Sequence, residues 1–183
     1  MTIRQIIKEI VYRIRGEYTT EKLIKMGMKV GKNFNRLIGV ILDPAHCWLI
    51  EIGDNVTMAP RVHILAHDAS TKMFLGYAKI GRVVIGNNVF IGTDTVVLPN
   101  VRIGDNVVIG ANSTVTKDLE GGFVYAGNPA KRICSIEEYI TKNKRLLDAC
   151  PCYGEEYTIR KNVDVEKKEQ MKRELDKGLG FVV

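Results

Sequence analysis

Ile85–Asp118 reads IGNNVFIGTDTVVLPNVRIGDNVVIGANSTVTKD, and an aliphatic residue occupies every sixth position of it. These positions are Ile85, Ile91, Val97, Ile103, Ile109 and Val115. Glycine directly follows most of them, with Asp or Asn close behind, as in IGNNV and IGDNV. An earlier stretch, IGDNVTMAPRVHILAHD at 52–68, keeps the same period at Ile52, Met58 and Ile64. The middle of the chain is therefore an internal repeat with a unit of six residues.

The period of six excludes an α-helix and favours short strands. At about 100° per residue, six helical residues rotate a side chain by about 240°, so the aliphatic residues would spiral around the axis. In a strand, alternate side chains face one side, and a unit such as Val89-x-Ile91 places two apolar side chains together. Gly and Asn tolerate the left-handed backbone region and turn the chain. Stacked units of this kind bury one continuous aliphatic column, as in a solenoid.

These repeats resemble the hexapeptide-repeat acyltransferases over about residues 30–134, from VGKNFN at 30–35 to AGNPAKRI at 126–133. Within that family, the chain looks most like the sugar, maltose, galactoside and polysaccharide O-acetyltransferases. The resemblance implies an all-β solenoid, a left-handed parallel β-helix with three hexapeptides per turn, assembled as a homotrimer. We therefore expect an N-terminal helical segment at 1–29, the β-helix at 30–134 with a loop excursion at 67–79, and a C-terminal helical tail at 135–183.

Helical patterns flank the repeat. Near the N-terminus an apolar stripe at helical spacing predicts an amphipathic helix; it consists of Ile3, Ile6, Ile7, Ile10, Val11 and Ile14. We expect this stripe to pack on the protein's own body or on a neighbouring subunit, with membrane attachment as the alternative. After the repeat, SIEEYITKNKRLLDA predicts a helix that begins with a capping box of Ser135 and Glu138, and a charge-rich helical stretch follows at about 164–177.

Composition narrows the function classes. The 183 residues are 45% hydrophobic, enough for one sizeable core, and carry a net charge of +6. No run of basic residues is interleaved with stacking aromatic residues, so nucleic acid is not an expected partner. Charges interrupt the opening stretch every three or four residues, which excludes a signal-peptide core or a membrane-spanning run there. We expect a cytoplasmic protein whose four cysteines are free thiols.

The repeat fails between Ile64 and Ile85, where His67–Lys79 reads HDASTKMFLGYAK. An excursion from a solenoid is usually a functional loop, and a tolerated surface insertion is the alternative. In the resembled family a histidine at the start of this loop is the general base, and His67 matches it. Imidazole suits that task because its pKa lies near working pH, whereas an alcohol does not ionise unaided.

Other interpretations of the histidines stay open. Three imidazoles are a known catalytic zinc set, so His46, His63 and His67 support a second hypothesis, a zinc-dependent hydratase of the carbonic anhydrase kind. Strand alternation directs His63 away from the interior. His63 is also the second candidate for the general base. A catalytically silent scaffold that binds glycans is the third hypothesis. We expect no metal requirement, and Cys47 lacks any local motif of a nucleophile.

The resemblance implies a site for the acyl donor, acetyl-CoA. In the resembled enzymes the pantetheine arm lies along the coils between two subunits, and the matching residues are Phe90, Gly92, Thr93, Ala111, Thr116 and Lys117. A backbone N–H near Gly92 and Thr93 is the expected oxyanion donor. Lys131 and Arg132 are candidates for the ribose phosphate of CoA. The resembled enzymes carry arginine where Lys131 stands and another where Cys134 stands, and Arg132 is a candidate substitute for these phosphate contacts.

The segment VILDPAHCW at 40–48 occupies the place where early coils of the family contribute polar groups to the acceptor. Asp43 and His46 are therefore candidates for acceptor binding, and an ordinary Asp-Pro turn is the alternative. Together these features predict an acetyl-CoA-dependent O-acetyltransferase that acts on a hydroxyl of a sugar or glycan precursor, with His67 as general base. Serine and antibiotics remain alternative acceptors.

Overall fold

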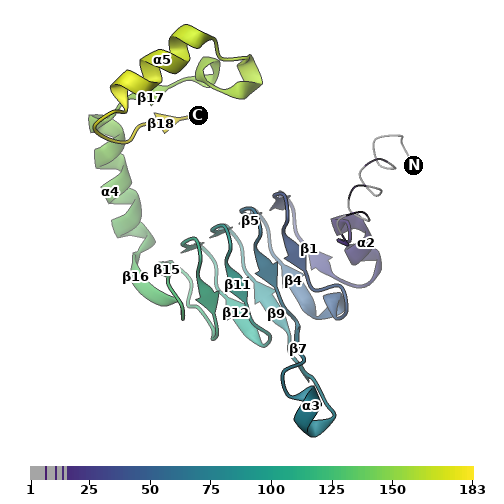
Figure 1. Ribbon diagram of the computed structural model, residues 1–183. Coiled ribbons are helices and arrows are strands. Elements are labelled where there is room, and N and C mark those ends of the chain that lie inside the picture. The colour runs from purple at the N-terminus through teal and green to yellow at the C-terminus, as the bar shows by residue number, and fades with distance from the viewer. Residues whose placement is uncertain (1–6, 8–10, 12–13, 15) are drawn as a thin grey trace. The chain divides into compact units, whose positions relative to one another are not determined.

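The computed structural model describes residues 7, 11, 14 and 16–183 of the chain (Figure 1). The chain divides into two compact units, Met1–Ile136 and Glu137–Val183. Most of the amphipathic stripe expected at residues 3–14 lies outside the described residues, and its described members, Ile7, Val11 and Ile14, are exposed. Among the described residues, no helix has both the length and the apolar character needed to cross a membrane.

In the first unit, short strands of the described chain stack into a solenoid with three sheets (Figure 1). Sheet A contains β1 (Lys29–Val30), β4 (Ile50–Ile52), β9 (Val83–Ile85) and β12 (Val101–Ile103). Sheet B contains β2 (Asn35–Arg36), β5 (Thr57–Met58), β10 (Val89–Ile91), β13 (Val107–Ile109), β15 (Phe123–Ala126) and β16 (Lys131–Ser135). Sheet C contains β3 (Ile41–Leu42), β6 (His63–Ile64), β11 (Val96–Val97) and β14 (Thr114–Val115). From β1 to β14 the strands of these sheets enter A, B and C in turn and pair in parallel; β15 then joins sheet B after only an isolated bridge of Leu119 to Ile103 of sheet A, and β16 returns antiparallel to β15.

The in-phase aliphatic residues of the repeat fill the centre of this solenoid, one from each strand. In sheet A, Ile52 pairs in register with Ile85, and Ile85 with Ile103. Sheets B and C repeat the arrangement with Met58, Ile91 and Ile109 and with Ile64, Val97 and Val115. All of these side chains are buried. The predicted solenoid with a single aliphatic column is therefore confirmed.

Two coils are longer than the regular one, and both extra segments leave the solenoid at one corner. Paired residues are 18 positions apart from β9 to β12, but 33 apart from β4 to β9 and 22 apart from β1 to β4. The first excursion follows β3 and contains the 3₁₀ helix η1 (Cys47–Leu49). The second follows β6 and contains β7 (His67–Asp68), α3 (Lys72–Leu75) and β8 (Lys79–Ile80). Because β3 and β6 are parallel neighbours, the two excursions begin side by side.

Asparagines hold the corner between sheets A and B. Asn33, Asn55, Asn88 and Asn106 all have φ near +55°, in the left-handed region that a short polar side chain tolerates. Their side-chain amides form a ladder of hydrogen bonds of 2.8–3.0 Å along the solenoid. This ladder explains why Asn stands two positions after the glycine in each of these repeats.

The solenoid begins one coil before the regular repeat. Its first-coil positions in register with the column are Val30, Arg36 and Leu42. The Arg36 side chain is only 5% exposed, and its guanidinium donates to the Tyr18 carbonyl at 2.8 Å and to the Val40 carbonyl. Because an arginine occupies a position that is aliphatic in the other coils, the hydrophobic pattern is interrupted and the sequence repeat does not reveal this coil.

Short helices and a small second unit complete the described chain. α2 (Thr20–Lys25) begins at a Thr19 cap and contributes the buried Leu23 to the core of the first unit. The second unit contains α4 (Ile136–Ala149), β17 (Cys152–Tyr153), η2 (Glu155–Tyr157), η3 (Ile159–Lys161), α5 (Val165–Glu174) and β18 (Phe181–Val182). The Asp164 side chain caps α5 by accepting the Lys167 N–H at 2.8 Å. The helices expected in the C-terminal tail are therefore present.

Candidate active site

The two excursions bring polar side chains together at the corner that follows sheet C. Asp43 comes directly after β3, and His67 comes shortly after the neighbouring strand β6. The Asp43 N–H still donates to the Ile64 carbonyl at 2.9 Å, so the ladder of sheet C reaches this point. Parallel pairing thus places Asp43 against a residue 24 positions away in the sequence.

The Asp43 carboxylate is buried and fixed from three directions. Its side chain is 1% exposed. Oδ1 accepts the Ala45 N–H at 3.0 Å, which closes the Asp-Pro turn, and Oδ2 accepts the Ala66 N–H at 2.9 Å. Oδ2 also lies 2.5 Å from Nδ1 of His67. These contacts compensate the burial of the charge and leave the carboxylate enclosed.

His67 has one ring nitrogen held and an edge open to solvent. Its side chain is 36% exposed. Because a carboxylate only accepts, the contact with Asp43 requires a proton on Nδ1, and in the neutral ring Nε2 then keeps its lone pair. An imidazole oriented by a carboxylate in this way is the arrangement of a general base. We call Asp43 and His67 the dyad.

The second excursion forms an arm that projects from the solenoid (Figure 1). At its neck, β7 pairs antiparallel with β8, and Lys79 Nζ lies 2.6 Å from Asp68 Oδ2. This ion pair, with the Ser70 N–H, holds the pKa of Asp68 well below its usual range. The apolar side chains at the tip of the arm are between 68% and 82% exposed; they are Met73, Phe74, Leu75 and Tyr77. The neck is therefore fixed, whereas the tip leaves a large apolar surface in solvent.

His46 lies beside the dyad. Its ring centroid is 5.2 Å from that of His67 and 5.4 Å from that of Trp48. One nitrogen of each of the two imidazoles and one carboxylate oxygen of Asp43 all lie within 4.8 Å of one another. His46 Nδ1 is buried, and no described residue gives it a hydrogen bond. We call Asp43, His46 and His67 the corner cluster.

Two other sequence candidates lie elsewhere. His63 is on β6 and is not part of the corner cluster, so the cluster contains two imidazoles rather than three. Cys47 is fully buried, and burial raises the pKa of its thiol. A raised pKa is the opposite of what a cysteine nucleophile requires.

Some residues assigned to acetyl-CoA lie on sheet B and at the corner between sheets B and C. Phe90 on β10 is 44% exposed. A Cβ on Gly92 would lie 2.5 Å from Ala111 N of the next coil, so coil stacking alone requires glycine there. The Gly92 N–H donates to the Ile109 carbonyl at 2.8 Å, and the Thr93 hydroxyl donates to a backbone carbonyl of the preceding coil at 2.7 Å. The Gly92 N–H is thus part of the hydrogen bonding between coils, and the oxyanion donor expected near Gly92 and Thr93 stays a prediction.

The remaining candidates for acetyl-CoA are exposed residues: Ala111 in the turn after β13, and four cationic or polar side chains. Thr116 and Lys117 follow β14, so they leave sheet C at the corner of the dyad, two coils further along. Lys131 and Arg132 lie on β16. The Arg132 guanidinium stacks on Phe123, 3.2 Å from the ring centroid. Of the residues assigned to acetyl-CoA, Thr116 and Lys117 are those that share a corner with the dyad.

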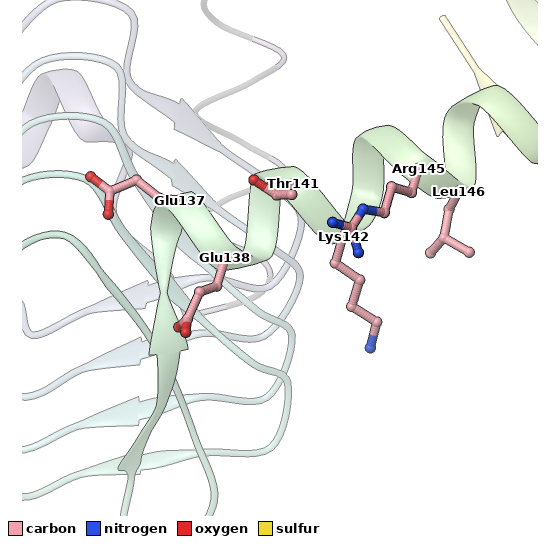
Figure 2. A pocket seen from close by; sticks show the side chains of 6 residues that line it. All are labelled: Glu137, Glu138, Thr141, Lys142, Arg145 and Leu146. Atoms are coloured by element: carbon pink, nitrogen blue, oxygen red, sulfur yellow. The ribbon is translucent and has the colours of Figure 1, made fainter.

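The second unit has a hollow of about 600 Å³ along α4. Figure 2 shows that its lining side chains all come from this one helix; they are Glu137, Glu138, Thr141, Lys142, Arg145 and Leu146. Acidic groups lie at the start of the helix and basic groups about two turns later. A single helix supplies every wall, so the hollow does not bring catalytic groups to one point.

The pairing of Asp43 with His67 is the feature that the sequence interpretation missed. We expected Asp43 to bind the acceptor, but its carboxylate is enclosed and contacts the predicted base. The apolar residue Leu42, directly before Asp43, is the signal in the sequence that could have shown this pairing. In the structure Leu42 is in register with Ile64, so Asp43 and the first residues of the loop follow neighbouring strands.

Sequence comparison assigns relatives to the chain. Residues 82–117 match the family described as bacterial transferase hexapeptide (six repeats). Protein CapG of Staphylococcus aureus is 44% identical over 135 residues, which cover 70% of this chain and 78% of that protein.

Solved structures give the same result. The maltose O-acetyltransferase from Clostridium difficile 630 superposes with a TM-score of 0.53 at 43% identity, over 60% of this chain and 59% of that chain. A hexapeptide-repeat acetyltransferase from Vibrio cholerae O1 biovar eltor, complexed with acetyl coenzyme A, has a TM-score of 0.54 at 25% identity, over 60% of this chain and 61% of that chain. The matched region thus spans about three fifths of each solved chain. The fold is the expected left-handed parallel β-helix, and the chain belongs to the hexapeptide-repeat transferase family.

Proposed function

We propose that this protein is an acetyl-CoA-dependent O-acetyltransferase that acts on a hydroxyl of a sugar or glycan precursor. The observation that carries the proposal is the dyad, in which a buried carboxylate holds Nδ1 of a half-open imidazole. Such a group supplies the base that a neutral hydroxyl needs. The maltose O-acetyltransferase and the acetyl-CoA complex among the similar structures support the acceptor class and the acyl donor. No metal is required for this reaction.

In the proposed reaction, His67 moves one proton out and back. Nε2 takes the proton of the acceptor hydroxyl as the oxygen attacks the thioester carbonyl carbon, and Asp43 stabilises the imidazolium that forms. The tetrahedral intermediate then collapses, the carbon–sulfur bond breaks, and the sulfur leaves with the proton that His67 returns. The products are an acetyl ester and CoA with a free thiol. No acyl-enzyme forms, which agrees with the burial of Cys47.

We propose that the donor lies along the outside of the coils. The pantetheine arm would contact the positions carried over from the family: Phe90, Gly92, Thr93, Ala111, Thr116 and Lys117. The ribose phosphate would lie near Lys131 and Arg132, and stacking on Phe123 preorganises the planar Arg132 fork for an anion. In a coil of three sheets, however, sheet B with Phe90 is opposite the corner that carries the dyad. Thr116 and Lys117 share the corner of the dyad, but the sheet B part of the donor path does not, so a second copy would complete the site.

We expect a homotrimer, in which the exposed tip of each arm covers a neighbouring copy. Monomers rarely keep so large an apolar surface in water, and a closed threefold arrangement buries each tip once. Sedimentation velocity at micromolar concentration is expected to give one species of three chains. The double variant Met73→Ser, Phe74→Ser should shift it toward monomers, whereas Lys72→Ser on the same short helix should not. A wild-type protein that sediments as a monomer would remove the shared site.

Equilibrium binding of CoA and a CoA-release assay against saccharides, serine and antibiotics test the reaction and its acceptor. We expect CoA to bind, and acetyl-CoA to be consumed fastest with a saccharide. Preference for serine or an antibiotic would change the acceptor class and leave the reaction in place, whereas a protein without CoA affinity would contradict the proposal. Chelators should leave the rate unchanged, because a loss of activity on metal removal is the result that the zinc hydratase predicts.

A further inference from the structure

We infer that the corner cluster also binds a divalent transition metal of the Zn²⁺ class, and that the bound metal switches off the dyad. The binding itself rests on the geometry of Asp43, His46 and His67. The inhibition rests on the proposed function, because it concerns the base of that reaction. The metal is thus an inhibitor of the site and not a cofactor.

The donor set has the composition that such metals select. Two imidazoles and one carboxylate, each offering one atom, lie within 4.8 Å of one another. Imidazole nitrogen and carboxylate oxygen are the common ligands of Zn²⁺ and of neighbouring transition metals, whereas all-oxygen sets suit Mg²⁺ and Ca²⁺. His67 is 36% exposed, which leaves an edge of the cluster open to solvent for a fourth ligand.

His46 gives an independent reason to expect a missing partner. Its Nδ1 atom is buried and has no hydrogen bond from any described residue. Buried polar atoms without a partner are rare in folded proteins, because the lost hydration is not compensated. The dyad does not need His46, since Ala45, Ala66 and His67 already satisfy the carboxylate. A metal ion that takes Nδ1 of His46 as a ligand would supply the missing partner, whereas a sugar hydroxyl has no exposed surface of that atom to approach.

The distances make the metal-bound and catalytic states mutually exclusive when Nδ1 of His67 is the ligand. Ligand atoms of a tetrahedral zinc site lie about 3.3 Å apart, given metal–ligand bonds of about 2.0 Å. The dyad contact is shorter than this, at 2.5 Å, and the full cluster is wider, at up to 4.8 Å. When the metal takes Nδ1 of His67, the dyad must therefore open by several tenths of an ångström, and the most widely spaced ligand atoms of the cluster must draw together. The two backbone donors to Asp43 hold the carboxylate in place during this change.

A metal bound to either ring nitrogen of His67 prevents this residue from acting as the base. A metal on Nε2 occupies the lone pair that would accept the hydroxyl proton. A metal on Nδ1 displaces the proton from that atom, and the neutral ring then carries it on Nε2, which becomes a donor. In both cases proton abstraction stops until the metal leaves.

The test uses Co²⁺ as a spectroscopic probe and Zn²⁺ as its competitor on the full chain. We expect one Co²⁺ per chain with visible d–d absorption, displaced by Zn²⁺. His46→Gln should weaken Co²⁺ binding by about 10-fold or more, a typical effect of disturbing a metal site. His63→Gln is the matched control, because it removes a histidine from sheet C outside the cluster, and its Co²⁺ affinity should equal that of wild type. Zn²⁺ should inhibit acetyl transfer reversibly, and His46→Gln should need correspondingly more Zn²⁺ for half inhibition of its own rate.

Several results would overturn the inference. Absence of Co²⁺ binding, equal binding by His46→Gln, or loss of binding in His63→Gln would each exclude the cluster as the site. Thiolate-to-cobalt charge-transfer absorption would assign the metal to cysteines such as Cys150 and Cys152 instead. Binding at the cluster without inhibition of a measurable acetyl transfer would refute the switch. If no acceptor is acetylated at all, the proposed function fails, while the Co²⁺ spectra of the variants still decide the metal site.

Discussion

Replacing His67 by alanine is expected to lower the turnover of acetyl transfer by about 10²–10⁴-fold, the usual contribution of a positioned general base. The variant loses the only imidazole that a described carboxylate holds by a hydrogen bond. Its fold should persist, because the side chain is partly exposed and Asp43 keeps two backbone donors. CoA affinity should persist as well, since the donor positions lie on other coils. Turnover measured at saturating acetyl-CoA separates this chemical loss from a binding defect.

His63→Ala is the control for the His67 variant. His63 lies on β6 beside the column residue Ile64 and takes no part in the corner cluster. Its removal should therefore change turnover much less than the removal of His67. Near-normal turnover of His67→Ala, together with abolished turnover of His63→Ala, would show that the base is assigned to the wrong histidine.

The solenoid could be predicted from the sequence because its period of six follows from the geometry of the coil. Every sixth residue faces the centre of a three-sided coil, so a position such as Ile91 must be apolar whatever the function. The same pattern fails at the first coil. Arg36 occupies a register position of the column and satisfies its guanidinium with backbone carbonyls, which hydrophobic periodicity does not detect.

The site could be predicted only in part, for a related reason. The sequence singles out His67 because the repeat breaks after Ile64, just before this residue. The contact with Asp43 depends on two excursions of different length meeting at one corner, and residues inside an excursion have no periodic constraint that fixes their direction. The local sequence also favours a purely structural role for Asp43, since Asp-Pro commonly forms a turn. In the structure Asp43 has both a structural contact and a contact with the predicted base: Oδ1 closes the turn, and Oδ2 contacts the imidazole of His67.

Asp43→Asn should show that Asp43 positions His67 rather than binding the acceptor. We expect turnover to fall by about 10²-fold or more, with the KM for acetyl-CoA unchanged, because the amide neither fixes the Nδ1–H tautomer nor stabilises the imidazolium. Asparagine has one acceptor oxygen where the carboxylate accepts from Ala45, Ala66 and His67. At least one buried donor is then left unpaired, so the free energy of unfolding should also fall by about 1–3 kcal/mol. Thermal unfolding measures that part separately.

Two further readouts distinguish positioning from a general loss of stability. In nitrogen-15 spectra of the imidazoles, neutral His67 should be protonated on Nδ1 in the wild type and shift toward Nε2 protonation in Asp43→Asn. In a double-mutant cycle, Asp43→Asn should cost almost no further turnover once His67 is alanine, because residues that act as a unit are not additive. If Asp43 instead binds the acceptor, the substitution should raise the acceptor KM and keep its full cost in the His67→Ala background. An unchanged tautomer together with additive losses would therefore separate Asp43 from the base and return it to the acceptor.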